Sequence, residues 1–232
     1  MSAAFAAVFG TPMAAAIFAL EVASVGVMYY VGLMPCVFSA LIASRFSANM
    51  GIHPERFHVT FIPEFTMLTA GKTILLAALC AGVATLLCVV LHRGGHLCQK
   101  LVKNPYLRVL CGGAVMIAVF LIRGDQAYHG ASVGLIEQAM EGHADWYAFL
   151  LKMALTAVTI GCGFKGGEIV PTFCVGATFG CMMGHLLGLS PSLCAACGMV
   201  ALFCGATNCP ISSLLISFEL FGYEGMPFFL IS

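Results

Sequence analysis

The sequence predicts an all-α, polytopic integral membrane protein built from broken and re-entrant helices. Three observations support this fold class. Only 9% of the residues are charged and 61% are hydrophobic, whereas a soluble domain has roughly 25% charged residues. Residues 169–218 contain no Lys, Arg, Asp or Glu, and about 20 apolar residues are enough to span a bilayer. Glycine and proline interrupt many of the apolar segments.

These apolar segments predict a series of helices, several of which are shorter than a full span. Gly10-Thr11-Pro12 interrupts the first segment, and Gly205 to Pro210 separates two later ones. Interrupted segments of this kind are typical of transporters whose helices stop within the membrane around a substrate. We expect helices at 3–23, 25–44, 69–92, 107–122, 147–162, 171–188, 192–204 and 210–221, with another beginning near Pro227.

The polar segments predict loops and an orientation. Residues 45–72 form the longest polar stretch and are expected to be a loop with short interfacial pieces. Residues 93–108 carry basic side chains and no acid, which predicts a cytoplasmic location. The formal net charge is zero, so nothing indicates a nucleic-acid partner. Met1 opens directly into an apolar segment without a basic region, so we expect no signal peptide and interpret this start as a cut in a longer protein.

The chain has twelve cysteines, and Cys194-x-x-Cys197 has the spacing of metal ligands. Cys204 and Cys209 follow within the same apolar region. Free cysteine in an apolar helix behaves as a small hydrophobic residue, and His185 is the nearest further candidate ligand. We therefore predict neither a metal site nor structural disulfides, and no cofactor.

An internal repeat relates the two ends of the chain. Residues 5–21 and 203–219 both read Phe, six residues, Pro, eight residues, Glu, so that Pro12 corresponds to Pro210 and Glu21 to Glu219. Small residues precede each proline and an apolar helix follows it. Transporter folds are often built from such repeats, so we interpret the pattern as a duplication.

The segment 161–171, Gly-Cys-Gly-Phe-Lys-Gly-Gly-Glu-Ile-Val-Pro, separates two apolar helices. Pro171 suits the first turn of a helix, because its missing N–H is not needed there. A helix start presents free N–H groups and the positive end of the helix dipole. Within a membrane it can hold an anion without a full positive charge, and weak contacts allow the anion to leave. The alternative is that these glycines only pack helices, which we prefer for Gly176, Gly180 and Gly184.

These residues resemble the CLC family of chloride channels and proton-coupled anion transporters. The resemblance rests on Gly166-Gly167-x-x-x-Pro171 followed by Gly176-Ala-x-x-Gly180, on the repeated Pro–Glu segments, and on residues 128–136. It implies an inverted-repeat, CLC-like bundle. Its domains would be residues 1–45 as the end of the first repeat, 46–72 as a linker, and 73–232 as most of the second repeat.

The resemblance also implies a site, an assembly and a location in the membrane. The predicted anion-binding residues are Gly166, Gly167, Glu168, Ile169 and Val170, with the amides of Glu168 and Ile169 facing the central anion. Glu168, Val170 and Pro171 are the predicted pore-lining or selectivity residues. A homodimer is implied, with contacts formed by the helices around 12–44 and 210–231.

Three features depart from the family pattern. The first-half anion motifs would lie before Met1 and the inner tyrosine beyond Ser232. Val22 stands where proton-coupled members often carry a second acid. Glu168 stands where most members have an apolar residue; a glutamate there is similar to the fluoride-exporting branch, although that branch tends to have Thr at the position of Val170.

Other ionisable residues are expected to have structural roles. Glu21 and Glu219 lie near helix ends and are expected to bond to neighbouring backbone, although an acid within a membrane helix is functional by default. Lys152 is expected to extend to the membrane interface. Lys165 either neutralises Glu168 or marks a helix end, and His185 is expected to be a packed or interfacial residue.

The sequence thus predicts a membrane protein that moves a small halide, chloride in the main interpretation, through a lipid-embedded path. A fluoride/proton antiporter of the same family is the alternative, and Glu168 distinguishes the two. Two other classes stay open: an intramembrane enzyme, for which no nucleophile–base cluster is visible, and a non-transporting membrane fragment. We expect no enzymatic activity.

Overall fold

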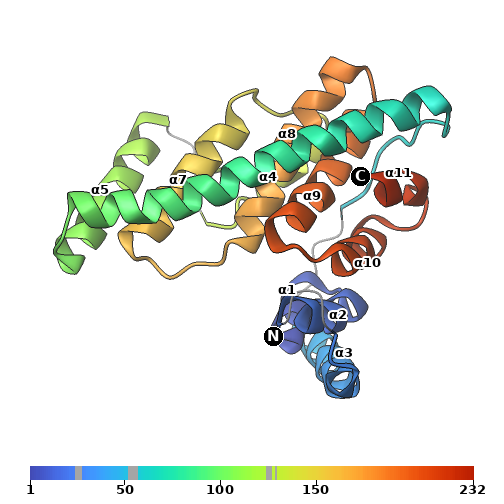
Figure 1. The fold of residues 1–232 in the computed structure, drawn as a ribbon, viewed down its shortest axis with the longest axis horizontal. Coiled ribbons are helices and arrows are strands. Elements are labelled where there is room, and N and C mark those ends of the chain that lie inside the picture. Colours follow the sequence, from blue (N-terminus) through green and yellow to red (C-terminus); the bar gives the residue numbers. More distant parts are fainter. Residues whose placement is uncertain (24–27, 52–56, 124–126, 129) are drawn as a thin grey trace.

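A computed structural model of the chain describes residues 1–23, 28–51, 57–123, 127–128 and 130–232, and these residues form helices joined by loops, without a strand (Figure 1). Their order confirms the all-α prediction. The elements are α1 (Ser2–Phe9), α2 (Pro12–Ala23), the 3₁₀ helix η1 (Tyr30–Gly32), α3 (Leu33–Asn49), α4 (Met67–Leu101), α5 (Pro105–Arg123), α6 (Val133–Met140), α7 (Ala148–Cys162), α8 (Ile169–Leu187), α9 (Pro191–Thr207), α10 (Pro210–Phe221) and α11 (Met226–Ile231).

The helices divide into long and short ones, as a broken-helix membrane protein requires. Among the described residues, four segments are long and apolar enough to cross a bilayer, and four further apolar helices are shorter. The prediction of a multi-pass integral membrane protein is therefore confirmed. The long segments are Tyr30–Asn49, Met67–Leu101, Pro105–Ile122 and Ile169–Leu187.

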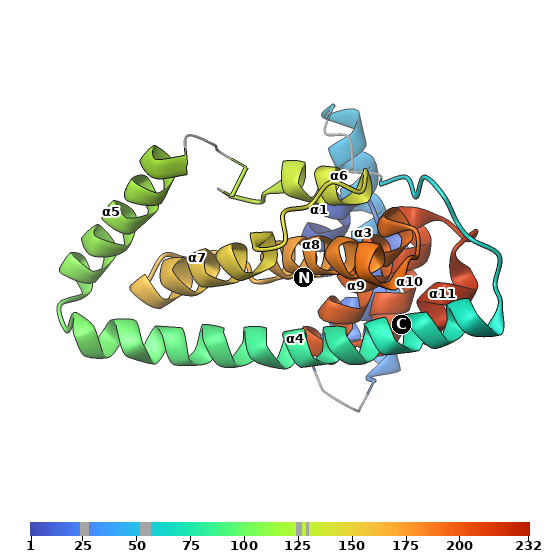
Figure 2. The same cartoon turned by 90° about the horizontal axis from the view of Figure 1, so that it is seen from above.

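The long helix α4 runs the length of the molecule, with α7, α8 and α9 packed against it (Figures 1 and 2). α5 turns back at one end of α4 and contacts α7. α1, α2 and α3 form a separate group that joins the rest of the bundle partly through contacts between α2 and α10. α8, which begins at the predicted site, thus lies in the interior of the bundle.

Glycines allow α8 and α9 to pack at very short distance. A Cβ atom added at Gly180 would lie 2.1 Å from the carbonyl oxygen of Cys194. One added at Gly176 would lie 2.6 Å from the carbonyl oxygen of Gly198. Real side chains do not tolerate such distances, so the packing role predicted for the glycines of α8 is confirmed.

A cluster of phenylalanine rings connects the N-terminal helices to this pair. The ring of Phe18 in α2 lies 5.5 Å from that of Phe203 in α9, measured between centroids. Phe9 in α1 lies 5.5 Å from Phe173 in α8, and Phe173 lies 4.9 Å from Phe203. These distances are within the range of favourable aromatic pairs. The cluster therefore packs α1 and α2 against the beginning of α8 and the end of α9.

The repeat is visible in the backbone hydrogen bonds. Gly10 ends α1 with a left-handed conformation, φ 66°, and its N–H donates to Ala6 O at 2.9 Å. Asn208 ends α9 in the same way, with φ 56° and a 2.8 Å bond to Cys204 O. These residues correspond when Pro12 is aligned with Pro210, so the two segments share the same helix end as well as the same pattern of residue types.

The two repeats also contact each other reciprocally. The Glu219 carboxylate, near the end of α10, accepts bonds from the first amides of α2, and the Glu21 carboxylate, near the end of α2, accepts bonds from the first amides of α10. Each helix end thus meets the start of the other helix, so the two helices are antiparallel. A reciprocal contact between corresponding residues requires a local two-fold axis. For helices that enter a membrane, this is an inverted repeat.

Three expected helices are corrected, and one helix was not predicted. The expected helix 3–23 is two helices, because the chain turns at Gly10 before Pro12. The expected helix 25–44 begins at Leu33, after η1, and residues 25–27 lie outside the described residues. The expected helix 69–92 is α4, which continues to Leu101, because a helix does not have to end where its apolar residues end. α6 was not predicted, because its eight residues lie in a polar segment. Its buried residues are Leu135, Ile136, Ala139 and Met140.

Candidate functional site

The chain breaks between α7 and α8, as the sequence predicts. α7 ends at Cys162, and Gly163 adopts a left-handed conformation with φ 102°, which glycine reaches without strain. Residues 163–168 are not helical, and α8 begins at Ile169. A helix start is therefore placed between the apolar helices of the bundle.

The amides at this helix start are free. Those of Glu168, Ile169 and Val170 have no hydrogen-bond partner among the described residues, and Pro171 has no N–H to satisfy. The first bond of the helix runs from Thr172 N to Glu168 O, 3.1 Å, and the Thr172 hydroxyl donates to the same oxygen at 2.7 Å. The Glu168 carboxylate does not cap its own helix. The positive end of α8 is thus open.

The starts of α2, α9 and α10 are closed by side-chain acceptors. Glu219 Oε2 accepts from Ala14 N at 2.8 Å at the start of α2, and Glu21 Oε2 accepts from Ser212 N at 2.9 Å at the start of α10. The Ser212 hydroxyl also donates to Glu21 Oε2. Ser190 closes the start of α9 through its hydroxyl. The start of α8 differs from these in lacking an internal acceptor within the described part of the chain.

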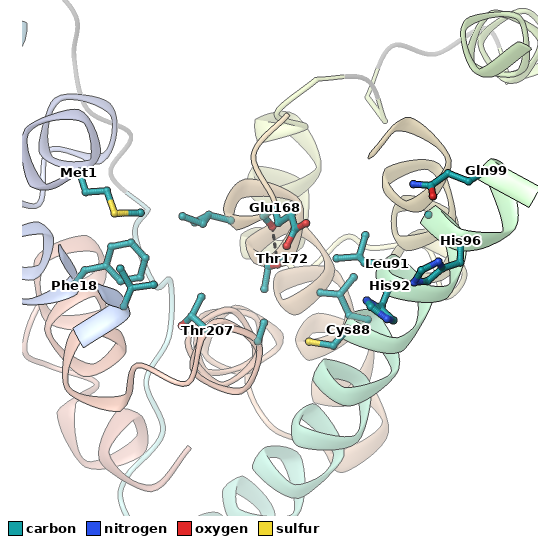
Figure 3. A pocket seen from close by; sticks show the side chains of 15 residues that line it. Met1, Phe18, Cys88, Leu91, His92, His96, Gln99, Glu168, Thr172 and Thr207 are labelled. Atoms are coloured by element: carbon teal, nitrogen blue, oxygen red, sulfur yellow. Dashed lines mark hydrogen bonds between the residues drawn. The ribbon is translucent and has the colours of Figure 1, made fainter. Parts of the chain in front are cut away.

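A cavity of about 550 Å³ lies on one side of this helix start (Figure 3). Glu168 projects into it from α8, and its backbone oxygen accepts the bond from Thr172. His92 and His96 of α4 lie on another wall, with their ring centroids 4.9 Å apart. The cavity is also bounded by Met1, Phe18, Val22, Leu87, Cys88, Leu91, Gly95, Gln99, Ile169, Ala206 and Thr207.

A second cavity, of about 350 Å³, lies on the other side of the same helix start. Its walls come from α5, α7, the residues Tyr128, Gly130 and Ala131, the segment before α8 and the first turn of α8. The side chain of Lys152 lies on this wall. The remaining residues that bound it are Met116, Tyr128, Gly130, Ala131, Leu155, Thr156, Thr159, Ile160, Gly166, Gly167, Val170 and Pro171.

The predicted site residues therefore surround one helix start but divide between two cavities. Glu168 and Ile169 bound the larger cavity, whereas Gly166, Gly167, Val170 and Pro171 bound the smaller one. Gly166, Gly167 and Glu168 are exposed, and Ile169 is half-buried. The free amides thus have open space on both sides.

Two predictions about ionisable residues are decided by the structure. The structural role expected for Glu21 and Glu219 is confirmed, since both carboxylates bind backbone amides. The expectation that Lys152 extends to the membrane interface is wrong. Its side chain is 3% exposed, and its ammonium is held by oxygens inside the bundle. The signal for this was its position inside the apolar segment 147–162, away from either end.

Other functional candidates were missed or take up new contacts. His92, His96 and Thr172 were not predicted to approach Glu168, because no sequence spacing relates α4 to α8. His185 is exposed, and its Nε2 lies 2.9 Å from Gly142 O. No ion pair joins Lys165 to Glu168 within the described ranges.

All twelve cysteines are free, and the described residues contain no cluster of three or more His, Cys, Asp or Glu able to hold a metal.

Broken apolar helices, an inverted repeat and an open helix start beside two cavities define an integral membrane channel or transporter. A comparison with protein families identifies the family of channels or transporters to which the chain belongs. The family described as voltage gated chloride channel matches residues 1–232, and the chain belongs to this family, the CLC channels and transporters.

Individual relatives agree with this assignment. A chloride/fluoride channel protein of Pseudomonas syringae pv. tomato is 34% identical over 234 residues, which cover 98% of this chain and 52% of the relative. An uncharacterized protein of Methanocaldococcus jannaschii is 23% identical over 224 residues, 93% of this chain and 55% of the relative. The crystal structure of a CLC-type fluoride/proton antiporter superposes with a TM-score of 0.93 at 30% identity and covers 100% of this chain and 59% of that one. The chain therefore spans about half the length of the relatives it matches.

Proposed function

We propose that the full-length protein moves a small halide anion across a membrane, and that the free amides of Glu168 and Ile169 hold the anion on its way. One contrast carries this proposal. Internal carboxylates occupy the starts of α2 and α10, whereas the start of α8 is open and has a cavity on either side. The two carboxylates show the chemistry that such a helix start favours, which is a negative charge held by peptide N–H groups.

The relatives support transport rather than catalysis. One is named for chloride and fluoride conduction, and the matching crystal structure is of a fluoride/proton antiporter. The mechanism needs no covalent step. Amide dipoles attract the ion when it leaves water, and because they carry only partial charges, the ion can leave again.

A second candidate, fluoride/proton antiport, is favoured by Glu168. Its side chain projects into the larger cavity beside the free amides (Figure 3). An ionised carboxylate there repels an anion, whereas a protonated one donates a hydrogen bond to a small, hard ion such as fluoride. Val22 and Val170 weigh against a complete match to that branch, because they stand where a second acid and a threonine are expected.

We also propose that the protein is a homodimer whose contact is formed by α2, α3, α10 and α11. α3 exposes Phe38 and Ile42, at 59% and 68%, and α10 exposes Ile211 at 50%. These side chains suit either lipid or a second copy. Crosslinking through Ile211→Cys in membranes tests the proposal: a disulfide-linked dimer is expected, and a chain that stays monomeric contradicts it.

Halide flux from liposomes tests the proposed function. Full-length protein is reconstituted, and the release of fluoride and of chloride is followed with ion-selective electrodes. We expect halide release from the wild type and a changed fluoride-to-chloride ratio for Glu168→Ile. Glu224→Gln, an exposed carboxylate that bounds neither cavity, is the matched control. Absence of flux of both ions refutes halide transport, and an unchanged ratio for Glu168→Ile refutes the role of Glu168 in selectivity.

A further inference from the structure

Lys152 is a buried cation that bounds the smaller of the two cavities next to the start of α8. Its side chain is 3% exposed and lies on the wall of the smaller cavity, which Gly166, Gly167 and Val170 also bound. Burying a charge is costly unless the surroundings compensate for it. A lysine in this position therefore requires an explanation that packing alone does not give.

The contacts of the ammonium occupy its N–H donors but do not neutralise its charge. Nζ donates to Tyr128 O at 3.1 Å, to Gly130 O at 2.9 Å and to Ser132 Oγ at 2.6 Å. A lysine ammonium has three N–H donors, so these three oxygens occupy all of them. Each oxygen is uncharged, so the bonds orient the ammonium without neutralising it.

We propose that Lys152 is a fixed-charge positioning residue that raises the halide affinity of the free amides at the start of α8 through space, without binding the ion itself. This inference rests on the proposed function. A cation with a free N–H at the site would bind the ion directly and slow its release. An ammonium whose donors are all occupied adds only its field, which in a low-dielectric interior extends over several ångströms.

The same contacts explain how the charge is held in place. Ser132 has a left-handed backbone, φ 55°, and begins α6, so the bond from Lys152 fixes the loop to α7 at this point. On α7, the Thr156 hydroxyl donates to Lys152 O at 2.8 Å. The lysine therefore has two separable attributes, a charge and a tether, and variants can remove one without the other.

Five variants of the full-length protein separate these attributes. Lys152→Met removes charge and tether; Lys152→Gln removes the charge but keeps N–H donors; Lys152→Arg keeps the charge. Ser132→Ala removes one tether acceptor and keeps the charge. Lys72→Met is the matched control, because Lys72 Nζ also donates to a backbone oxygen, Leu187 O at 2.6 Å, at the opposite end of α8.

Binding of sodium fluoride and sodium chloride to detergent-solubilised protein is measured by calorimetry at constant ionic strength, together with liposome flux and the melting temperature. We expect about tenfold weaker halide binding for Lys152→Met and Lys152→Gln, because both variants lose the field of one charge in a low-dielectric interior. Binding within about threefold of wild type is expected for Lys152→Arg, Ser132→Ala and Lys72→Met. If Lys152→Met does not fold, halide binding by Lys152→Gln shows whether the charge of Lys152 raises halide affinity.

The alternative outcomes are distinct. Wild-type flux combined with unchanged binding in Lys152→Gln overturns the inference and leaves halide transport standing. Equal losses of binding in Ser132→Ala and Lys152→Gln show that the lysine acts only as a tether, which also overturns it. A wild type that neither binds nor moves a halide refutes the proposed function, and the inference fails with it.

Discussion

The carboxylate of Glu219 accepts a 2.8 Å hydrogen bond from the backbone amide of Ala14, more than two hundred positions earlier in the chain. The corresponding pair, Glu21 and Ser212, makes the same contact at 2.9 Å in the opposite direction. The two repeats are thus joined by a pair of matching carboxylate caps. These caps also explain why the starts of α2 and α10 are unavailable to an external anion, whereas the start of α8 is available.

Removing the charge of either cap will destabilise the contact between the repeats. Glu21→Gln and Glu219→Gln each weaken a charge-assisted bond at a helix start, at an expected cost of about 1–2 kcal/mol. Thermal unfolding of the solubilised protein measures this, with Glu224→Gln as an exposed control. Melting temperatures equal to that of the control for both variants would show that the caps do not stabilise the repeat contact.

The close packing of α8 and α9 will not accept a side chain at Gly180. In Gly180→Ala the new Cβ meets the Cys194 carbonyl at 2.1 Å, so the helices must separate, at an expected cost of about 3 kcal/mol or more. Gly82→Ala in α4 is the control, because its Cβ meets nothing within 4 Å. The control is expected to gain up to about 1 kcal/mol from helix propensity. Equal stability of both variants, measured by thermal unfolding, would contradict the packing.

The left-handed backbone at Gly10 and Asn208 predicts that stability rises when glycine is introduced at one position and falls when glycine is removed from the other. Asn208→Gly gives the second repeat the residue of the first and is expected to stabilise the protein by about 0.5 kcal/mol, since glycine adopts φ 56° without strain. Gly10→Val is expected to cost about 1–2 kcal/mol at φ 66°. Unfolding midpoints of the two variants should shift in opposite directions; a shift of both in the same direction would argue against this shared geometry.

Much of the fold follows from the sequence because its signals are local. Prolines and glycines mark where the helices stop, so the end of α7 at Cys162 and the start of α10 at Pro210 were predicted at the observed residues, whereas α8 begins at Ile169, two residues before the expected start. The Pro–Glu repeat predicted equivalent helices but not their reciprocal caps, because spacing along the chain does not reveal which helix end meets which. α6 was missed for a physical reason as well: eight residues in a polar segment give too little periodicity.

The candidate site was predicted only in part, because local sequence patterns do not show which distant segments come into contact. Residues 166–171 were identified from the need for a free helix start, and the structure leaves those amides free. The burial of Lys152 depends on oxygens from residues 128, 130 and 132, which are contributed by a loop some twenty positions earlier. The approach of His92 to the cavity of Glu168 depends on the packing of α4, which no local pattern encodes.

Amide NMR measures whether the first amides of α8 bind the transported halide. Full-length protein labelled with ¹⁵N is placed in lipid nanodiscs and titrated with sodium fluoride and, separately, sodium chloride. Halide binding at this helix start predicts a saturable shift of the Glu168 and Ile169 amide signals with at least one of these salts, while the capped amides of Ala14 and Ser212 stay unchanged. Glu168 and Ile169 signals that do not move with either ion, or that move no more than those of Ala14 and Ser212, would contradict it.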